Sequence, residues 1–278
     1  METHRLHEEL LRRKVNILVV GCGGSGSAVV GGLPYLHGAM LAQGHPYGLQ
    51  VTVMDGDTIS PFNSVRQPFA KNEVGLNKAI VLVNRINLFW GLGWAAIPRA
   101  LTEEPLHPQY ASYNGQSLHP DIVIGCVDTR AARAMIAKCV SGWSLTGYWL
   151  DIGNASSSGQ FALGEPLNAR NKRSAMRLRT VSELYPEVSN SALDDDNEPS
   201  CSALEAVMRQ EPYVNAVLAH HALALLARLF RYGEISYHGA FIDVAAARTV
   251  PLPVDPQLWR RIRRRKACQQ LEGKSRVA

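Results

Sequence analysis

The residues best suited to chemistry gather behind a glycine-rich segment near the start of the chain. Gly21-Cys-Gly-Gly-Ser-Gly26 follows an apolar run and precedes small residues that can begin a helix. Backbone N–H groups at such a turn bind phosphate, because the first turn of a helix leaves them without partners. A glycine turn also serves any closely packed strand and helix, so the loop alone does not decide the matter. The candidate phosphate-binding residues are Gly21, Gly23, Gly24 and Gly26.

Carboxylates follow two later apolar runs. Asp55 and Asp57 end the first of these, and Asp128 ends the second. In a parallel sheet the ends of the strands meet at one edge, which is where ligands bind. A carboxylate after the second strand is placed to accept hydrogen bonds from a ribose, although an aspartate there is also an ordinary turn residue.

Polar and cationic side chains lie between these carboxylates in the sequence, namely Asn63, Arg66, Gln67 and Lys78. An enzyme that breaks a triphosphate needs cations near the phosphates and a carboxylate for Mg²⁺. A hydride-transferring enzyme needs little such help. The set therefore favours ATP chemistry over a nicotinamide-dependent oxidoreductase, which the glycine loop and Asp55 alone would also fit.

Apolar periodicity predicts the elements that position this chemistry. Short β-branched runs predict buried strands over residues 15–20, 49–54 and 121–127. Helical spacing of apolar residues predicts helices over 77–86 and 130–140. This alternation predicts an α/β fold with a doubly wound, mostly parallel, Rossmann-like sheet.

The carboxyl half has a different composition. Residues 164–200 are polar, basic first and then acidic, and we expect a long, mobile crossover loop there. A long buried helix is predicted to begin near Pro212, and a hairpin follows over 236–251. Asp255-Pro256 is typical of the start of a final helix. The expected division is one ATP-binding domain, residues 1–259, and a basic tail, residues 260–278.

Positive charge is concentrated at the C-terminus. The formal net charge is +5, but residues 260–278 hold eight Lys or Arg and one acid, so residues 1–259 carry −2. The body of the chain therefore does not support nucleic acid as a partner. The tail itself fits a solvated terminus as well as a helix that contacts nucleic acid or an acidic protein.

Cysteine usage and hydropathy indicate the compartment. The five cysteines are widely spaced with no CxxC pair, which argues against a disulfide framework and a four-thiolate zinc site. No apolar run approaches the ~20 residues of a membrane helix, and residues 1–14 lack the apolar core of a signal peptide. We expect a cytoplasmic protein without a membrane partner.

Taken in order, these motifs resemble the ubiquitin-activating-enzyme superfamily, which includes the bacterial ThiF and MoeB adenylyltransferases. The resemblance rests on the glycine loop, Asp55-x-Asp57, Asn63-x-x-Arg66-Gln67, Lys78 before an apolar helix, and Cys126-Val-Asp128-x-x-x-x-Arg133. Within that group the chain is most similar to the ThiF-related member of the PRTRC cassette of bacterial mobile elements. Asp151-Ile-Gly-Asn and Gln210-x-x-Tyr-Val-Asn215 recur in that type.

The resemblance implies adenylation of the C-terminal carboxylate of a small ubiquitin-like or sulfur-carrier-like protein. It implies that the glycine loop cradles the phosphates of ATP and that Asp55, with Asp57 beside it, holds the ribose. Asn63, Arg66 and Lys78, with Gln67 adjacent, would neutralise the triphosphate, and Asp128 would hold Mg²⁺. Relatives are homodimers that contribute an arginine across the interface, for which Arg12 or Arg13 is the candidate here.

The chain departs from this pattern in its cysteines. ThiF and MoeB carry paired CxxC zinc ligands and this chain has none, so we expect no structural zinc. Some relatives pass the acyl group to a cysteine in the crossover loop, for which Cys201 is the candidate nucleophile. It precedes the capping pattern Ser202-Ala-Leu-Glu205, and a helix N-terminus lowers the pKa of a thiol. An unreactive, half-buried cysteine explains Cys201 equally well.

Other polar residues have simpler explanations. Arg99 and Arg133 are expected at solvated ends of elements, and His220-His221 inside a packed helix. The main alternative function is an ATP-binding interaction module that has this fold without turnover. Binding of ATP without pyrophosphate exchange would favour that module, and a preference for NADH over ATP would favour an oxidoreductase.

Overall fold

The computed structural model describes residues 2–103, 112–113, 116–117, 119–174, 176–194 and 210–275. Its principal strands are β2 (Val15–Val20), β3 (Leu49–Met54), β4 (Ala95–Ile97), β7 (Ile122–Gly125), β8 (Tyr148–Asn154), β9 (Ser158–Gly164), β11 (Tyr237–Asp243) and β12 (Arg248–Pro253). Its longer helices are α1 (Gly24–Ala42), α2 (Lys78–Trp90), α4 (Arg130–Gly142), α7 (Val214–Tyr232) and α8 (Pro256–Ser275). Short pieces complete the chain: β1 (His4–Arg5), η1 (Glu8–Leu11), η2 (Asn63–Val65), η3 (Lys71–Glu73), β5 (Ser112–Tyr113), β6 (Gln116–Ser117), α5 (Val181–Leu184), η4 (Pro186–Ser189), η5 (Ser191–Leu193) and β10 (Glu234–Ile235).

The principal strands form one eight-stranded sheet in the order β12-β11-β9-β8-β7-β2-β3-β4. The pairs from β8 to β4 are all parallel, whereas the pairs from β8 to β12 are antiparallel. The chain reverses its direction of travel across the sheet at β2, since β3 lies on one side of it and β7 on the other. This is the switch point of a doubly wound sheet, so the predicted fold class is confirmed.

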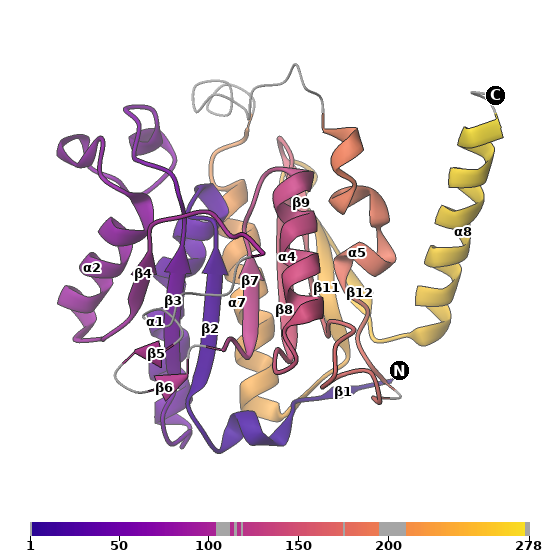
Figure 1. Cartoon of the computed structure of the whole chain (residues 1–278), viewed down its shortest axis with the longest axis horizontal. Coiled ribbons are helices and arrows are strands. Elements are labelled where there is room, and N and C mark those ends of the chain that lie inside the picture. The colour runs from indigo at the N-terminus through magenta and orange to yellow at the C-terminus, as the bar shows by residue number, and fades with distance from the viewer. Residues whose placement is uncertain are drawn as a thin grey trace.

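Helices cover both faces of the sheet. Right-handed crossovers place α1 and α2 on one face and α4 on the other, and α7 packs along α1 and against β8 and β9. Figure 1 shows α4 in front of the sheet and α1 and α7 behind it. Because both faces are covered, strands such as β7 and β3 are almost wholly buried and apolar.

The predicted elements of the amino half are confirmed closely. Strands β2 and β3 occupy the predicted residues 15–20 and 49–54. The Asn77 side chain caps α2 by accepting a hydrogen bond from the N–H of Ile80 at 3.1 Å, and Thr129 caps α4 in the same way. Both caps fix where the helices begin beside the strand ends.

The segment expected to be a crossover loop is irregular up to residue 180, where the structure describes it, and then forms the short helices α5, η4 and η5. It also supplies buried polar groups: Glu165, Asn168 and Arg177 are each 5% exposed or less. The Glu165 carboxylate accepts the N–H of Leu178 at 2.8 Å and lies 2.7 Å from Nε2 of His7. The segment therefore ties the N-terminus to the sheet, and its mobility stays a prediction.

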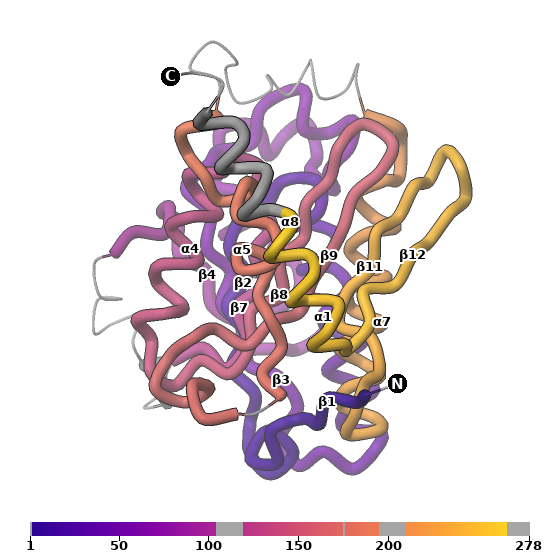
Figure 2. The backbone as a smooth tube through the Cα atoms, turned by 90° about the vertical axis from the view of Figure 1, so that its right-hand side faces the viewer, coloured from indigo at the N-terminus to yellow at the C-terminus, as the bar shows by residue number. Residues whose placement is uncertain are grey.

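The final helix begins where Asp255-Pro256 predicts. Oδ1 of Asp255 accepts the N–H groups of Gln257 and Leu258 at 2.8 and 3.0 Å. Trp259 is buried and the helix continues past it, so the expected division after residue 259 falls inside α8. Figure 2 shows the first turns of α8 crossing the outside of the molecule.

One edge of the sheet is strand β12, whose only partner in the described sheet is β11. Its sequence, RTVPLP, contains Pro251 and Pro253 two positions apart. Within the described residues, no helix is long and apolar enough to span a membrane.

Candidate functional site

The glycine loop is shaped by close backbone contacts at the carboxyl edge of the sheet. Gly21 has a φ of +95°, and a Cβ there would lie 2.7 Å from the carbonyl oxygen of Cys126. A Cβ on Gly26 would lie 1.9 Å from the carbonyl oxygen of Gly21. Only glycine allows this packing of α1 against the strand ends. By contrast, no atom of the described residues lies within 4 Å of the Cβ position of Gly23, so that part of the chain leaves space for an anion at the N-terminus of α1.

Asp55 holds the glycine loop to the second strand. One carboxylate oxygen accepts the N–H of Cys22, and the other accepts the N–H of Asp57 at 2.7 Å. The side chain is nearly buried, and this desolvation raises the pKa of Asp55 although both N–H groups oppose the shift. The contact positions the phosphate loop; the contact with a ribose stays a prediction.

Lys78 brings a cation to the same edge. Its stem is buried and its Nζ lies 2.8 Å from the carboxylate of Asp57, whose side chain is 72% exposed. Asn77 beside it donates from Nδ2 to the backbone oxygens of Asp55 and Asp57. The strand end and the start of α2 are thereby held together, and the Lys78 charge is close enough to oppose the rise in the pKa of Asp55.

The turn from Asn63 to Gln67 is folded around the Asn63 side chain. That side chain is buried and its oxygen accepts the N–H of Ser60 at 2.7 Å. The backbone oxygen of Asn63 accepts the N–H groups of Arg66 and Gln67. The side-chain oxygen of Gln67 is buried and makes no hydrogen bond within the described residues. The turn thus leaves one buried polar atom without a hydrogen bond among the described residues.

A chain of side-chain contacts links this turn to the glycine loop. Arg66 donates from Nη1 to the Gln210 side chain, which also lies 3.4 Å from Nδ2 of Asn215. Asn215 in turn accepts a hydrogen bond from the Ser25 hydroxyl at 3.0 Å, and its side chain lies against Gly24. Residues far apart in sequence are therefore held in one line around the N-terminus of α1.

The structure adds three residues to the predicted set. The glycine motif contains Ser25 but predicts no role for it. The motif that contains Gln210 and Asn215 supports the resemblance to the family without predicting a role for either residue. Tyr213 between them is exposed and has a φ of 70°, a left-handed backbone that costs energy in a residue other than glycine. Strain of this kind often accompanies function.

Asp128 stands exposed after β7, at the same edge. Within the described residues its carboxylate has no hydrogen-bond partner, so its oxygens are open to a cation, and Mg²⁺ prefers such ligands. No group of three His, Cys, Asp or Glu suited to a metal occurs in the described ranges. One exposed carboxylate fits an ion whose other ligands are phosphate oxygens and water.

The cysteines differ in their suitability as nucleophiles. Burial raises the pKa of Cys22, Cys126 and Cys139, which disfavours the reactive thiolate in each. Cys201 and the capping pattern after it lie outside the described residues, so its candidacy as the nucleophile stays a prediction.

The expectation that Arg133 is solvated is wrong. Its Nε lies 2.9 Å from the Asp151 carboxylate, both side chains are nearly fully buried, and Nη2 donates to the backbone oxygen of Val127 at 3.0 Å. The guanidinium therefore stabilises the backbone that follows β7 through its hydrogen bond to Val127. Arg13, one of the two candidates for a cross-dimer arginine, pairs with Asp121, whereas Arg12 is exposed beside Glu8.

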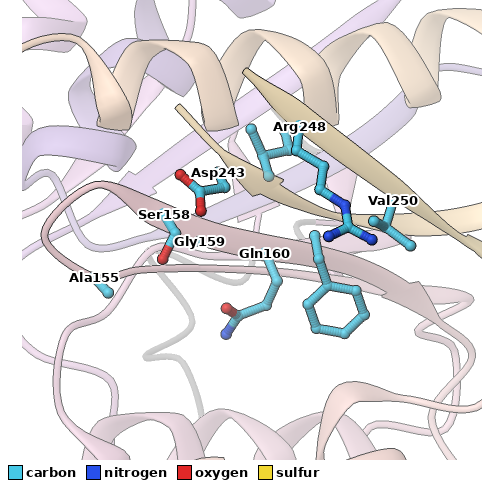
Figure 3. Close-up of a pocket in the computed structure, with 9 residues that line it drawn as sticks. Ala155, Ser158, Gly159, Gln160, Asp243, Arg248 and Val250 are labelled. Atoms are coloured by element: carbon cyan, nitrogen blue, oxygen red, sulfur yellow. The ribbon is translucent and has the colours of Figure 1, made fainter. Parts of the chain in front are cut away.

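A pocket of about 310 Å³ lies at the carboxyl edge of the sheet, among its antiparallel strands. It is formed where β9 begins, β11 ends and β12 begins, so pairing of β9 with β8 places it at the edge that carries the glycine loop. Figure 3 shows Gln160, Asp243 and Arg248 around it, with Val250 beside the arginine. It offers both apolar and polar groups to a bound chain.

The sheet order and the glycine loop define a Rossmann-like α/β protein with its site at the switch point. The chain belongs to the ThiF family, whose family model matches residues 5–248. The expected superfamily is therefore confirmed, although nothing tests the finer likeness to the PRTRC type.

Solved structures share the fold at low identity. The selenomethionine form of PaaA is 13% identical, with 89% of this chain and 65% of that chain covered and a TM-score of 0.54. E. coli MccB with MccA-N7isoASN is 15% identical, with 89% and 66% covered and a TM-score of 0.52. MccB with AMPCPP and selenomethionine MccA is 16% identical, with 90% and 66% covered and a TM-score of 0.51. This chain spans about two thirds of the length of these proteins. A search of curated proteins gave no match.

Proposed function

We propose that the protein uses ATP to adenylate the C-terminal carboxylate of a small ubiquitin-like or sulfur-carrier-like protein. The observation that carries the proposal is the gathering of Lys78 and Arg66 around the open N-terminus of α1. Lys78 is connected to the loop through Asp57 and Asp55, and Arg66 through Gln210 and Asn215. Two cations and a helix dipole converge where the phosphates of a nucleotide can bind.

The proposed reaction is an in-line displacement at the α-phosphorus of ATP, and the arrangement of the cations supports it. An oxygen of the carrier's carboxylate attacks the α-phosphorus of ATP, the bond from that phosphorus to the bridging oxygen breaks, and pyrophosphate leaves with the electron pair. Negative charge grows on the α-phosphate and on the leaving group. In the proposed complex, Lys78, Arg66 and the N–H groups of the loop lie near that charge and stabilise it with little reorganisation, because contacts within the protein already hold them in place.

Asp128 is the residue we assign to Mg²⁺. The ion supplies charge neutralisation at the phosphate oxygens when it is bound. Asp57 is exposed at the same edge and already neutralised by Lys78, so Asp128 is the better ligand.

A structural neighbour supports the choice of substrates. MccB has been solved with AMPCPP together with MccA. A protein with this fold therefore binds a nucleotide and MccA together, and we propose that this chain holds a nucleotide and a carrier in the same way. The pocket beside Arg248 is the surface we assign to the carrier's C-terminal segment.

We further propose that the protein is a homodimer. Tyr35 on α1 and Leu88 and Phe89 on α2 are at least two-thirds exposed, and Trp90 joins the rings of Tyr35 and Phe89 at centroid distances of 5.0 and 5.3 Å. This apolar cluster suits a second copy of the chain. Sedimentation of the wild type and of Phe89→Glu tests it: a wild-type monomer would contradict the proposal.

The central experiment is ATP–pyrophosphate exchange, with the small proteins encoded beside this one as candidate carriers. We expect carrier-dependent exchange in the wild type and a loss of at least about 100-fold in Asp128→Ala. Asp194→Ala is a matched control, since it also removes a carboxylate near the start of α4. Exchange that survives in Asp128→Ala would contradict the assigned mechanism, and ATP binding without exchange would favour an interaction module.

Thioester formation is a separate step of the proposal: the Cys201 thiolate attacks the acyl carbon of the adenylate, the bond from that carbon to the phosphate oxygen breaks, and AMP leaves. A mass adduct formed with carrier, ATP and Mg²⁺ should appear on Cys201 and be lost in Cys201→Ala, while pyrophosphate exchange persists. The same adduct on both proteins would show that Cys201 is not the nucleophile.

A further inference from the structure

The first turns of α8 divide sharply into a basic and an apolar side. Every arginine in these turns is exposed: Arg260, Arg261, Arg263, Arg264 and Arg265. At 100° per residue these five cover an arc of about 200° around the helix, and Leu258, Trp259 and Ile262 fall in the remaining arc. We call the five residues the arginine face.

The apolar side fixes the helix to the body. Trp259 is 3% exposed and meets the ring of His238 edge-on at 5.1 Å between centroids. Ile262 packs against the main core, and Asp255 caps the first turn. The arginines therefore project from an anchored helix.

The arginine face is not neutralised within the described residues. None of its members forms an ion pair there, and the sequence holds no Asp or Glu from residue 256 to residue 271. The neighbouring helix α5 carries Glu183, which is already paired with Arg177 and Arg179. Figure 2 shows the first turns of α8 toward the viewer, with no labelled helix or strand in front of them. Five like charges repel one another within about two turns of one helix, and a bound polyanion would remove that cost.

We propose that the arginine face binds double-stranded nucleic acid through its phosphates, without sequence preference. Duplex DNA carries a charge about every 1.7 Å along its axis, a density that matches five arginines within about 7.5 Å of helix. Because the arginines surround more than half of the helix, they can reach both walls of a major groove, which admits an α-helix. A flat acidic protein surface would engage only part of that arc. Guanidinium groups also suit bidentate binding of phosphate.

This inference does not depend on the adenylation proposal, because the body of the chain carries −2 and the face lies on a separate helix. The protein would thereby be held on nucleic acid by α8 while its catalytic edge stays available.

The test is fluorescence anisotropy of a labelled short DNA duplex with the full-length protein, from about 50 to about 200 mM salt. We expect the wild type to bind, with an affinity that falls as salt rises. The variant with all five arginines changed to Gln should bind at least about tenfold more weakly at the lowest salt, with a flatter salt dependence. A matched control changes five exposed cations elsewhere to Gln: Arg5, Arg12, Lys71, Lys172 and Arg173.

The outcomes separate the proposal from its rivals. Equal binding by wild type and arginine-face variant, or an equal loss in the control, would overturn it. Binding of polyglutamate but not of DNA would assign the face to an acidic protein and would also overturn it. Replacing the five arginines with Lys should restore most of the affinity, since a phosphate contact is chiefly electrostatic.

Discussion

The exposed carboxylates at the carboxyl end of the parallel strands contrast with the buried ones at the amino end, although the carboxyl end also buries Asp55 and Asp151 with their partners. At the carboxyl end, Asp57 is 72% exposed and Asp128 is exposed as well. At the amino end, the carboxylates of Asp121 and Glu165 are 4% and 1% exposed and are fully engaged by Arg13, by His7 and by backbone N–H groups. Charge that must meet a ligand stays near solvent, and charge that holds the fold together is buried with its partners.

The contrast predicts that the amino end controls stability and the carboxyl end controls activity. Removing the partner of a buried charge leaves the desolvation penalty of that charge uncompensated and lowers the free energy of unfolding. An exposed ion pair contributes little to that free energy. Substitutions at the two ends should therefore separate the free energy of unfolding from the exchange rate.

The largest expected effect is at Glu165. Glu165→Ala leaves the N–H of Leu178 and the ring of His7 without their acceptor, which should lower the free energy of unfolding by about 4 kcal/mol. Glu165→Gln keeps an acceptor and should cost less. Urea denaturation measures both, and exchange per folded molecule should stay unchanged; a stable Glu165→Ala protein would break the comparison.

The next effect is a dependence of stability on pH. His238 is buried and its Nδ1–H donates to Leu163 at 2.7 Å, and burial lowers its pKa to about 4 from 6.5. The unfolded chain takes up the proton first, so stability is full above pH 6.5 and falls as the pH drops to about 4, by about 3 kcal/mol. Burial also lowers the pKa of His4, which acts in the same direction.

Unfolding measured across this pH range tests the assignment. His238→Asn keeps a donor near the position of Nδ1 without its titration, so its stability should vary less with pH, with the remainder due to His4. An equally steep fall in His238→Asn would show that other groups control the acid response.

A comparable effect on rate, with little effect on stability, is expected at the carboxyl end. Lys78→Met keeps the buried stem and removes the cation, so exchange should fall about 100-fold. Its unfolding free energy should change by less than about 1 kcal/mol, because its partner Asp57 is exposed. Lys71→Met, an exposed control, should change neither.

The smallest effect is expected at Asp57 itself. Asp57→Asn keeps the backbone contact with Asp55 and removes one exposed charge, so stability should change by less than about 1 kcal/mol. The exchange rate measured alongside it tells whether the carboxylate does more than orient Lys78. A loss of several kcal/mol would contradict the division between the two ends.

Short sequence patterns predicted the strands and the glycine loop because residues adjacent in the sequence determine these elements. An apolar run beside Gly21 and another before Asp55 gave β2 and β3 at their observed residues. Nothing local indicates that Asn215 packs on Gly24, or that Arg133 meets Asp151 inside the fold. An arginine at a helix start is usually solvated, and the sequence does not show which carboxylate the fold will bury beside it. The residue types of the candidate site were thus predictable from the sequence, whereas the contacts between those residues were not.

The prolines of β12 have a consequence for the protein at high concentration. An edge strand exposes a row of N–H donors, which is a template for another molecule's strand and a start for aggregation. Pro251 and Pro253 have no N–H to offer, and their spacing places both gaps on the same side of the strand. At the β12 edge of the described sheet, Pro251 and Pro253 therefore disfavour pairing with a strand of a neighbouring molecule.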